Sequence, residues 1–565
     1  MDKNRKMFLG IGGVVGLLAL LLCAAAIGSY FYWDRIAGIL GLAQPQNVAR
    51  MLPEDTQFYM AITPNLQALP GYQNIKKLYL DNPDIKKMLD ELKDEMKDEA
   101  EISFEEDIQP WLGTEIVIAA PNLSESMSQS AMGANATPAV IIAAQTTDRE
   151  ASDKFIAKIL DQAEKDDKPF SSDTYAEVTI YSQPDEFDED VNLATFDEFV
   201  VIATEAELLQ QMIDRSQGNT ESTALADSAK YQKVLSELPP NAALTMFMDF
   251  GALFSAMLED SPIELPAEQA QNLEAFDAMG MAGLLQPDGF QLDTVVTYDL
   301  EKMSDDMKAA LKQSASPNAI HADIPASALF VYNISNLNRM WEQIKLSLEQ
   351  TPDFAETLQD FETEMGISLD DDVFGWMTGE FAIVVVEAAE SAPGSPPVGG
   401  YLLIGTDDVE VAKDKVAQIM AIFEEQGMPP LETIEIDGIE VHASTDPFTE
   451  EVQGGYGFHK NYFFMAFLED SIKALASASE DSFENSKNFM AVREHLPAEN
   501  FGYFYADIEH IVQIVDSQLS DFEREDYETN VQPFLEPIRA VGASADVGGV
   551  EQGISKGTFF VLVTE

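Results

Sequence analysis

The sequence contains a single cysteine, Cys23, which lies inside an apolar N-terminal stretch. The rest of the chain therefore has no disulfide, no thiolate nucleophile and no metal site built from cysteine. Proteins outside the cytoplasm whose cores are large do not need disulfides for stability, so this absence is compatible with an extracytoplasmic location.

Basic residues are also scarce. Lys and Arg number 33 against 99 Asp and Glu, which gives a formal net charge of −66. Such a surface repels phosphate backbones, so the composition excludes nucleic-acid binding, and it argues against docking on anionic lipids through a polybasic face. The acidic excess has two interpretations: a surface that binds cations or a basic partner, or a surface that only keeps the protein soluble. With 46% hydrophobic residues the chain is expected to fold.

Signatures of catalysis are missing as well. The sequence has no HExxH, P-loop or GxSxG motif, and the glycine-rich run Leu9–Gly16 belongs to the apolar N-terminal stretch. The five histidines are scattered through the second half: His321, His442, His459, His495 and His510. We therefore predict no catalytic and no cofactor-binding residue. With 99 carboxylates, an active site formed by two acidic residues stays an alternative.

The acidic runs are the remaining metal candidates. Asp370–Asp372 resembles a calcium loop, but phenylalanines occupy positions where such a loop needs ligands, so we interpret it as a solvated turn. The densest acidic loop provides weak calcium candidates at Asp185, Glu186, Asp188, Glu189 and Asp190. Trp111 and Trp376 are candidates to stack on a sugar, but a tryptophan beside a strand is more often part of the core.

The N-terminus predicts a membrane anchor. Residues 7–33 carry no charge and are long enough to cross a bilayer, while Lys and Arg residues in 1–6 precede them. The positive-inside rule then places residues 1–6 in the cytoplasm and the bulk of the chain outside the plasma membrane, after a juxtamembrane linker at 34–47.

Three further features of this segment leave alternatives open. Ala24–Ala26 would suit cleavage of a signal peptide, and Cys23 would suit lipoprotein processing, although Leu22 is bulky for that reaction. Gly12 and Gly16 form a GxxxG pair that could bring two such helices together. The oligomeric state is not defined by the sequence.

One stretch occurs twice. ISFEEDIQPWLGTEIVI begins at Ile102 and ISLDDDVFGWMTGEFAI at Ile367, with Asp107/Asp372, Trp111/Trp376 and Glu115/Glu380 in register. The same order of expected strands and helices recurs around both copies. Because the repeat spans about 260 residues, it is domain duplication rather than a solenoid. We predict an α+β fold with an N-terminal transmembrane helix, then a largely antiparallel first copy at 48–300, a linker at 301–322 and a second copy at 323–565.

Two local signals are specific. Asn82 before Pro83 predicts the start of a helix, and Asp437-Gly438 between alternating apolar residues predicts a hairpin turn.

These features together resemble a bacterial protein family, the domain of unknown function 3352. The resemblance depends on the Leu52–Tyr59 opening, the Asn-Pro helix start, the Trp-Leu-Gly stretch at Trp111–Gly113 and the duplicated layout, and it covers most of residues 48–565. It implies a short membrane segment followed by an extracytoplasmic repeat. The family has no established activity, so the resemblance assigns no functional residue.

Three functions follow as hypotheses. The first is a non-enzymatic envelope protein that binds a partner or acts as a scaffold, since two copies multiply binding surfaces. The second is a carboxylate-dependent hydrolase of envelope polymers, which requires two close carboxylates, one with a raised pKa. The third is a module that binds a cation or a small ligand.

Overall fold

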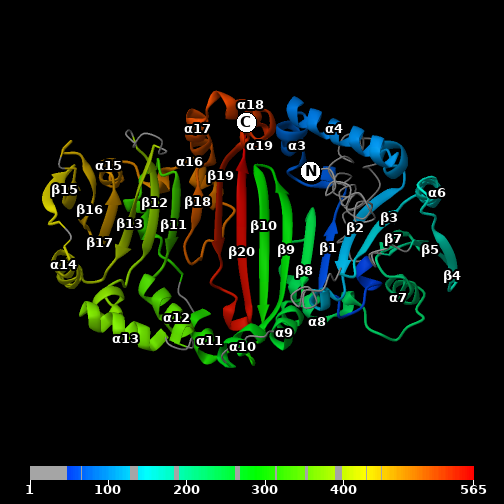
Figure 1. Ribbon diagram of the computed structural model, residues 1–565, viewed down its shortest axis with the longest axis horizontal. Coiled ribbons are helices and arrows are strands. Elements are labelled where there is room, and N and C mark those ends of the chain that lie inside the picture. The colour runs from blue at the N-terminus through cyan, green and yellow to red at the C-terminus, as the bar shows by residue number, and fades with distance from the viewer. Residues whose placement is uncertain are drawn as a thin grey trace. The chain divides into compact units, whose positions relative to one another are not determined.

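The structure is a computed structural model that describes residues 47–64, 66–126, 138–183, 190–260, 267–311, 315–349, 354–388, 397–427, 429–446 and 448–564 (Figure 1). The chain forms two compact units. The first comprises Met1–Leu265 and Leu273–Lys302, and the second comprises Pro266–Asn272 and Met303–Glu565.

The strands of the first unit form an antiparallel ladder in the order β4-β5-β6-β7-β3-β2-β1-β8-β9-β10. The strands are β1 (Phe58–Ile62), β2 (Leu112–Ala120), β3 (Ile141–Thr146), β4 (Ser171–Tyr175), β5 (Val178–Gln183), β6 (Val191–Phe196), β7 (Phe199–Ala203), β8 (Leu244–Met248), β9 (Phe276–Gln286) and β10 (Gly289–Tyr298).

The helical segments of the first unit are η3 (Val48–Arg50), η4 (Leu66–Ala68), α3 (Tyr72–Ile75), η5 (Lys76–Leu80), α4 (Pro83–Ala100), η6 (Phe104–Ile108), α6 (Arg149–Lys165), α7 (Ala206–Ser216), η7 (Leu225–Asp227), α8 (Ala229–Glu237) and α9 (Phe250–Asp260). Helix α10 (Ala267–Glu274) has residues in both units.

The second unit repeats this ladder strand for strand, in the order β14-β15-β16-β17-β13-β12-β11-β18-β19-β20. The strands are β11 (Phe330–Ile334), β12 (Phe381–Glu387), β13 (Val398–Gly405), β14 (Glu432–Ile436), β15 (Ile439–Thr445), β16 (Val452–His459), β17 (Tyr462–Phe467), β18 (Phe504–Ala506), β19 (Ile538–Ala545) and β20 (Ile554–Val563).

Its helical segments are α11 (Asp305–Leu311), η8 (Ala319–Asp323), α12 (Leu337–Glu349), α13 (Phe354–Met365), η9 (Leu369–Phe374), α14 (Val409–Glu425), α15 (Glu469–Ser477), η10 (Phe483–Asn485), α16 (Lys487–Arg493), α17 (Ile508–Gln518), α18 (Asp521–Asn530), α19 (Gln532–Leu535) and η11 (Val550–Gln552).

The predicted fold class needs correction. It began with a transmembrane helix, but no helix in the described ranges is both long and apolar enough to cross a membrane, and the predicted segment at 7–33 lies outside those ranges. It also predicted sheets that are only largely antiparallel. In the described residues each unit contains ten strands, and every strand pairing within a unit is antiparallel, with helices in addition.

The duplicated stretch forms the same local structure in both units. Ser103 caps η6 by accepting from the Glu106 N–H at 3.4 Å, and Asp107 accepts from the Ser103 N–H at 2.7 Å. The Trp111 indole then donates to the Asp107 carbonyl at 2.7 Å. The second unit repeats all three bonds at Ser368, Asp372 and Trp376, with lengths of 3.3, 2.8 and 3.2 Å in the same order. The serine, acid and tryptophan are therefore structural, and both tryptophans are buried core residues, as the sequence suggested.

A buried glutamate, Glu115 in β2 and Glu380 just before the equivalent strand β12, also has the same role in both units. Glu115 accepts from the Tyr59 hydroxyl at 3.4 Å and interacts with the Val48 N–H, so it holds η3 in place. Glu380 accepts from the Ser316 hydroxyl at 2.7 Å and the Ile320 N–H at 3.0 Å, so it holds η8. Each carboxylate thus satisfies backbone donors of a short helix that has few partners of its own.

The two specific local predictions are confirmed. The Asn82 side chain accepts from the Asp84 N–H at 2.9 Å at the start of α4. Asp437 and Gly438 connect β14 to β15 with φ angles of 48° and 83°, which is the left-handed pair that a two-residue hairpin turn requires.

Candidate functional site

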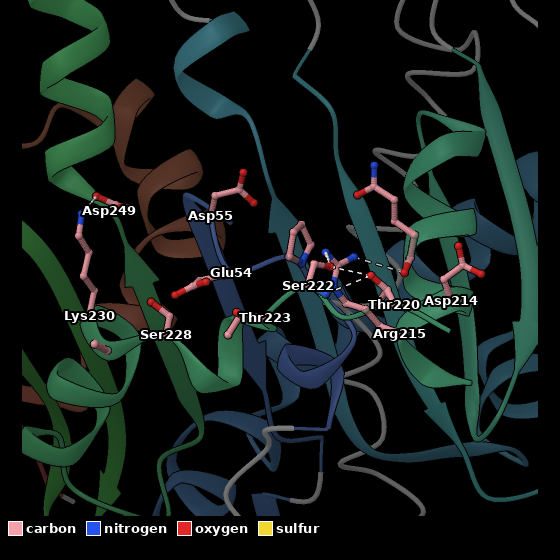
Figure 2. A pocket seen from close by; sticks show the side chains of 13 residues that line it. Glu54, Asp55, Asp214, Arg215, Thr220, Ser222, Thr223, Ser228, Lys230 and Asp249 are labelled. Carbon is pink, nitrogen blue, oxygen red and sulfur yellow. Dashed lines mark hydrogen bonds and ion pairs between the residues drawn. The ribbon is translucent and has the colours of Figure 1, made fainter. Parts of the chain in front are cut away.

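The first unit contains a pocket of about 760 Å³ that is lined mainly by residues with polar or charged side chains (Figure 2). Four segments that are distant in sequence form it. The turn before β1 contributes Pro53–Asp55, the end of α7 and the following loop contribute Gln211–Thr223, the start of α8 contributes Ser228–Lys230, and the end of β8 contributes Asp249. The volume lies in the range of pockets that bind small molecules.

Arg215, in the last turn of α7, supplies a cationic group to this wall. Its Nη1 donates to the Gln211 carbonyl at 3.3 Å and its Nη2 donates to the Ser222 hydroxyl at 3.0 Å. Its Nε is buried and has no acceptor among the described residues, and no described carboxylate forms an ion pair with it. Burial lowers the pKa of Arg215, against the opposing attraction of Asp55 and Asp214.

Lys230 lies at another part of the wall, where it forms ion pairs with two aspartates. Its Nζ contacts both carboxylate oxygens of Asp249, at 2.9 and 3.0 Å, and Asp277 at 3.4 Å. Burial disfavours the charge, but these carboxylates outweigh it and raise the pKa of Lys230. Asp249 also caps α9 by accepting from the Ala252 N–H at 2.9 Å, so this pair holds elements together as well as lining the pocket.

The loop between α7 and η7 is tied down by hydrogen bonds. The Asn219 N–H donates to the Asp214 carbonyl at 2.7 Å, and the Gln217 side chain donates to the Ala176 carbonyl at 2.8 Å. The Tyr175 hydroxyl donates to the Asp214 carboxylate at 2.8 Å. The loop therefore has a defined shape, and the Asp214 carboxylate has a fixed position.

The second unit allows a position-by-position comparison, because the same backbone bonds recur. The Glu54 N–H donates to the Thr223 carbonyl at 3.2 Å, and the Ala326 N–H donates to the Asp481 carbonyl at 3.0 Å. Glu54 therefore corresponds to Ala326, and the following Asp55 corresponds to Ser327.

The helix that supplies Arg215 can be aligned in the same way. Met212 of α7 and Leu475 of α15 are both fully buried at equivalent turns, so Asp214 corresponds to Ser477 and Arg215 to Ala478. From these residues to Leu225 and Phe483 the first unit is five residues longer. The charges of Glu54, Asp55, Asp214 and Arg215 and the longer loop are thus absent from the second unit.

The structural residues of the same region behave differently. Asp249 corresponds to Asp507, which caps α17 by accepting from the His510 N–H at 3.2 Å. Ser228 corresponds to Ser486 at the start of the equivalent helix. Asp249 and Ser228 are therefore repeated, while Glu54, Asp55, Asp214 and Arg215 are not. Lys230 corresponds to Asn488, which replaces the ion pair with a hydrogen bond to Asp507.

The metal candidates predicted from the sequence do not contribute to this pocket. Asp185, Glu186, Asp188 and Glu189 lie outside the described residues, and Asp190 is exposed just before β6. Within the described ranges, no group of three or more His, Cys, Asp or Glu residues has the arrangement of a metal site.

The acidic run of the second copy and its histidines also have other partners. Asp370 contacts Lys345 and accepts from the Trp341 indole at 2.8 Å, so it is not merely a solvated turn. His442 stacks on Tyr456, while His459 lies 3.4 Å from Asp323.

Sequence reasoning missed the pocket because its residues form no motif. The available signal was an alignment of the two copies. In it the charged pairs Glu54-Asp55 and Asp214-Arg215 of the first copy correspond to the uncharged pairs Ala326-Ser327 and Ser477-Ala478 of the second.

The fold and the pocket define a two-unit antiparallel α+β protein with a polar cavity in its first unit. The chain belongs to the family described as "Protein of unknown function (DUF3352)", whose model matches residues 14–563, as the resemblance indicated. No curated protein matches the chain.

Several solved structures match part of the chain. Crystal form III of TP0453 is 12% identical over 47% of this chain and 84% of that chain, with a TM-score of 0.24. Crystal form I is 13% identical over the same shares with a TM-score of 0.24, and form IV is 12% identical over 44% and 79% with a TM-score of 0.23. Similarity at this level supports no conclusion about this chain.

Proposed function

We propose that the protein is a non-catalytic binding protein whose first unit takes a small polar ligand in the pocket around Arg215. One observation supports this most strongly: four of the six charged residues that line the pocket, Glu54, Asp55, Asp214 and Arg215, have the uncharged equivalents Ala326, Ser327, Ser477 and Ala478 in the second unit. Since the second unit has the same strand order without them, the fold does not need these charges.

The charges are also poorly compensated within the protein. Glu54 and Asp55 are exposed and form no ion pair with a described residue, and Arg215 has a buried Nε without an acceptor. Leaving a buried donor unsatisfied costs free energy. Arg215 is therefore not held here for the stability that it gives to the fold.

The hydrolase alternative has no comparable support in the pocket. Among the described carboxyl groups, Glu115 is the one whose pKa is raised, and Glu115 is not among the residues that line the cavity. Two further points stay predictions from the sequence: that the protein is anchored in the cell envelope, and that it binds another envelope protein.

The test uses the full-length chain and a matched variant. The four changes Glu54→Ala, Asp55→Ser, Asp214→Ser and Arg215→Ala install the residues of the second unit, so the variant should fold. Thermal unfolding is followed with a panel of free amino acids, dipeptides, diamines, dicarboxylates and monosaccharides at millimolar concentration. Binding to the native state raises the unfolding midpoint.

We expect at least one probe to raise the midpoint of the natural protein and not that of the variant. If no probe in the panel raises it, or if the variant responds equally, the pocket is not the binding site and the proposal is refuted.

A further inference from the structure

We infer that the ligand is a zwitterion: a compound with a carboxylate and an ammonium group a few ångströms apart, such as an amino acid or a short peptide with free ends. This inference rests on the proposed function and specifies the ligand of the same pocket. It follows from the arrangement of charges around Arg215 (Figure 2).

Arg215 provides the site for the carboxylate. A guanidinium group offers a planar fork of N–H donors that matches the two oxygens of a carboxylate. In this protein the group is held in one orientation by the Gln211 carbonyl and the Ser222 hydroxyl, and both partners are neutral. The positive charge of Arg215 therefore remains available to a ligand anion.

The carboxylates of Glu54, Asp55 and Asp214 provide the site for the ammonium group. Asp55 and Asp214 both act electrostatically on Arg215, so they lie near the point where the ligand carboxylate binds. Asp214 is fixed by the Tyr175 hydroxyl at 2.8 Å, which orients it without neutralising it.

The balance of charge separates a zwitterion from simpler ligands. The six charged side chains on the wall are four carboxylates and two cations, in a chain of net charge −66, so a simple anion would be repelled. A simple cation would be attracted to the carboxylates but would compete with the guanidinium of Arg215 for Asp55 and Asp214. A zwitterion satisfies both signs at once, and the volume of about 760 Å³ is sufficient for a dipeptide.

The inference is tested with three matched probes and the full-length chain in isothermal titration calorimetry. Alanyl-alanine has both charges, N-acetyl-alanyl-alanine retains only the carboxylate, and alanyl-alanine amide retains only the ammonium group. We expect alanyl-alanine to bind at least about tenfold more tightly than either blocked form, because each blocked form loses one charged hydrogen bond.

Two variants assign the ends of the ligand. Arg215→Ala should weaken alanyl-alanine by about tenfold or more while leaving the affinity for the amide unchanged or higher. Asp55→Ser combined with Asp214→Ser should weaken alanyl-alanine and leave N-acetyl-alanyl-alanine unchanged or tighter. Arg493→Ala, which removes an exposed arginine of α16 in the second unit, is the control and should change no affinity.

The outcomes separate this inference from the proposed function. Equal or tighter binding of either blocked dipeptide to the natural protein would refute the zwitterion while leaving a ligand pocket in place. Binding of alanyl-alanine that survives both pocket variants would refute the assignment of the pocket itself. If none of the three probes binds while a sugar or diamine from the panel does, the ligand class is wrong and the proposed function stands.

Discussion

Glu115 gives the sharpest prediction about stability, because its carboxyl group is buried next to β1 with only 1% of its surface exposed. Burial raises the pKa of Glu115 from its ordinary value of 4.5 to about 7, despite hydrogen bonds from the Val48 N–H and the Tyr59 hydroxyl that favour the ionised form. One pKa unit corresponds to about 1.4 kcal/mol, so ionisation of Glu115 destabilises the first unit by about 3 kcal/mol.

The sign follows from proton linkage. Between pH 4.5 and 7 the folded state keeps the proton of Glu115 and the unfolded state has lost it, so the free energy of unfolding falls as pH rises through this window. The contribution is complete below pH 4.5 and absent above pH 7. Glu115→Gln keeps the shape of the side chain and removes the titration, so the variant should gain about 3 kcal/mol relative to the natural protein between pH 4.5 and pH 8.

The assay must report the first unit alone, because a two-unit chain need not unfold in one step. Hydrogen exchange of the β1 and β2 amides at pH 5 and pH 8, corrected for intrinsic exchange rates, gives the free energy of opening in that unit. Glu207→Gln, at an exposed position of α7, controls for the loss of one negative charge. A difference between Glu115→Gln and the natural protein that is the same at both pH values would refute the reasoning.

Three further predictions concern two buried positions and one partly exposed ion pair. Burial lowers the pKa of His321 to about 4. The free energy of unfolding of the second unit should therefore be highest above pH 6.5 and fall by about 3 kcal/mol as the pH drops to 4, because the unfolded state binds a proton that the folded state does not. His321→Gln should abolish this pH dependence in hydrogen exchange of the β11 amides. Gly280→Ala should destabilise the first unit by about 1–3 kcal/mol in urea denaturation, because the added Cβ would lie 2.1 Å from Cγ1 of Val234 on α8; an unchanged midpoint would contradict this packing. Asp107→Ala should cost about 1–2 kcal/mol through the lost bond to the Ser103 N–H, whereas Lys158→Met should cost no more than about 1 kcal/mol because that ion pair is partly exposed; equal losses would show that the pair outweighs the cap.

The sequence was sufficient for features that depend on neighbours along the chain. The Asn82 cap and the Asp437-Gly438 turn are local, since each is determined by backbone preferences over a few residues. The repeated serine, acid and tryptophan of the duplicated stretch could also be located, although the hydrogen bonds that make them structural could not.

The strand order could not be predicted from the sequence. Strand β1 pairs with β2 on one side and with β8, more than 180 residues later, on the other. Periodicity indicates which face of a strand is buried but not which distant strand lies beside it. The pocket depends on that order, because its wall brings together the turn before β1 and the ends of α7 and β8.

The duplication also changes how the acidic composition should be interpreted. A net charge of −66 alone favours a solvated surface. Comparing the two units divides the remaining charges into two groups. Asp107 and Asp372, Glu115 and Glu380, and Asp249 and Asp507 recur because each satisfies backbone donors that any chain with this ladder must satisfy. Charges at Glu54, Asp55, Asp214 and Arg215 occur once, in a cavity, with no such duty to the fold, so ligand binding is the role that remains for them.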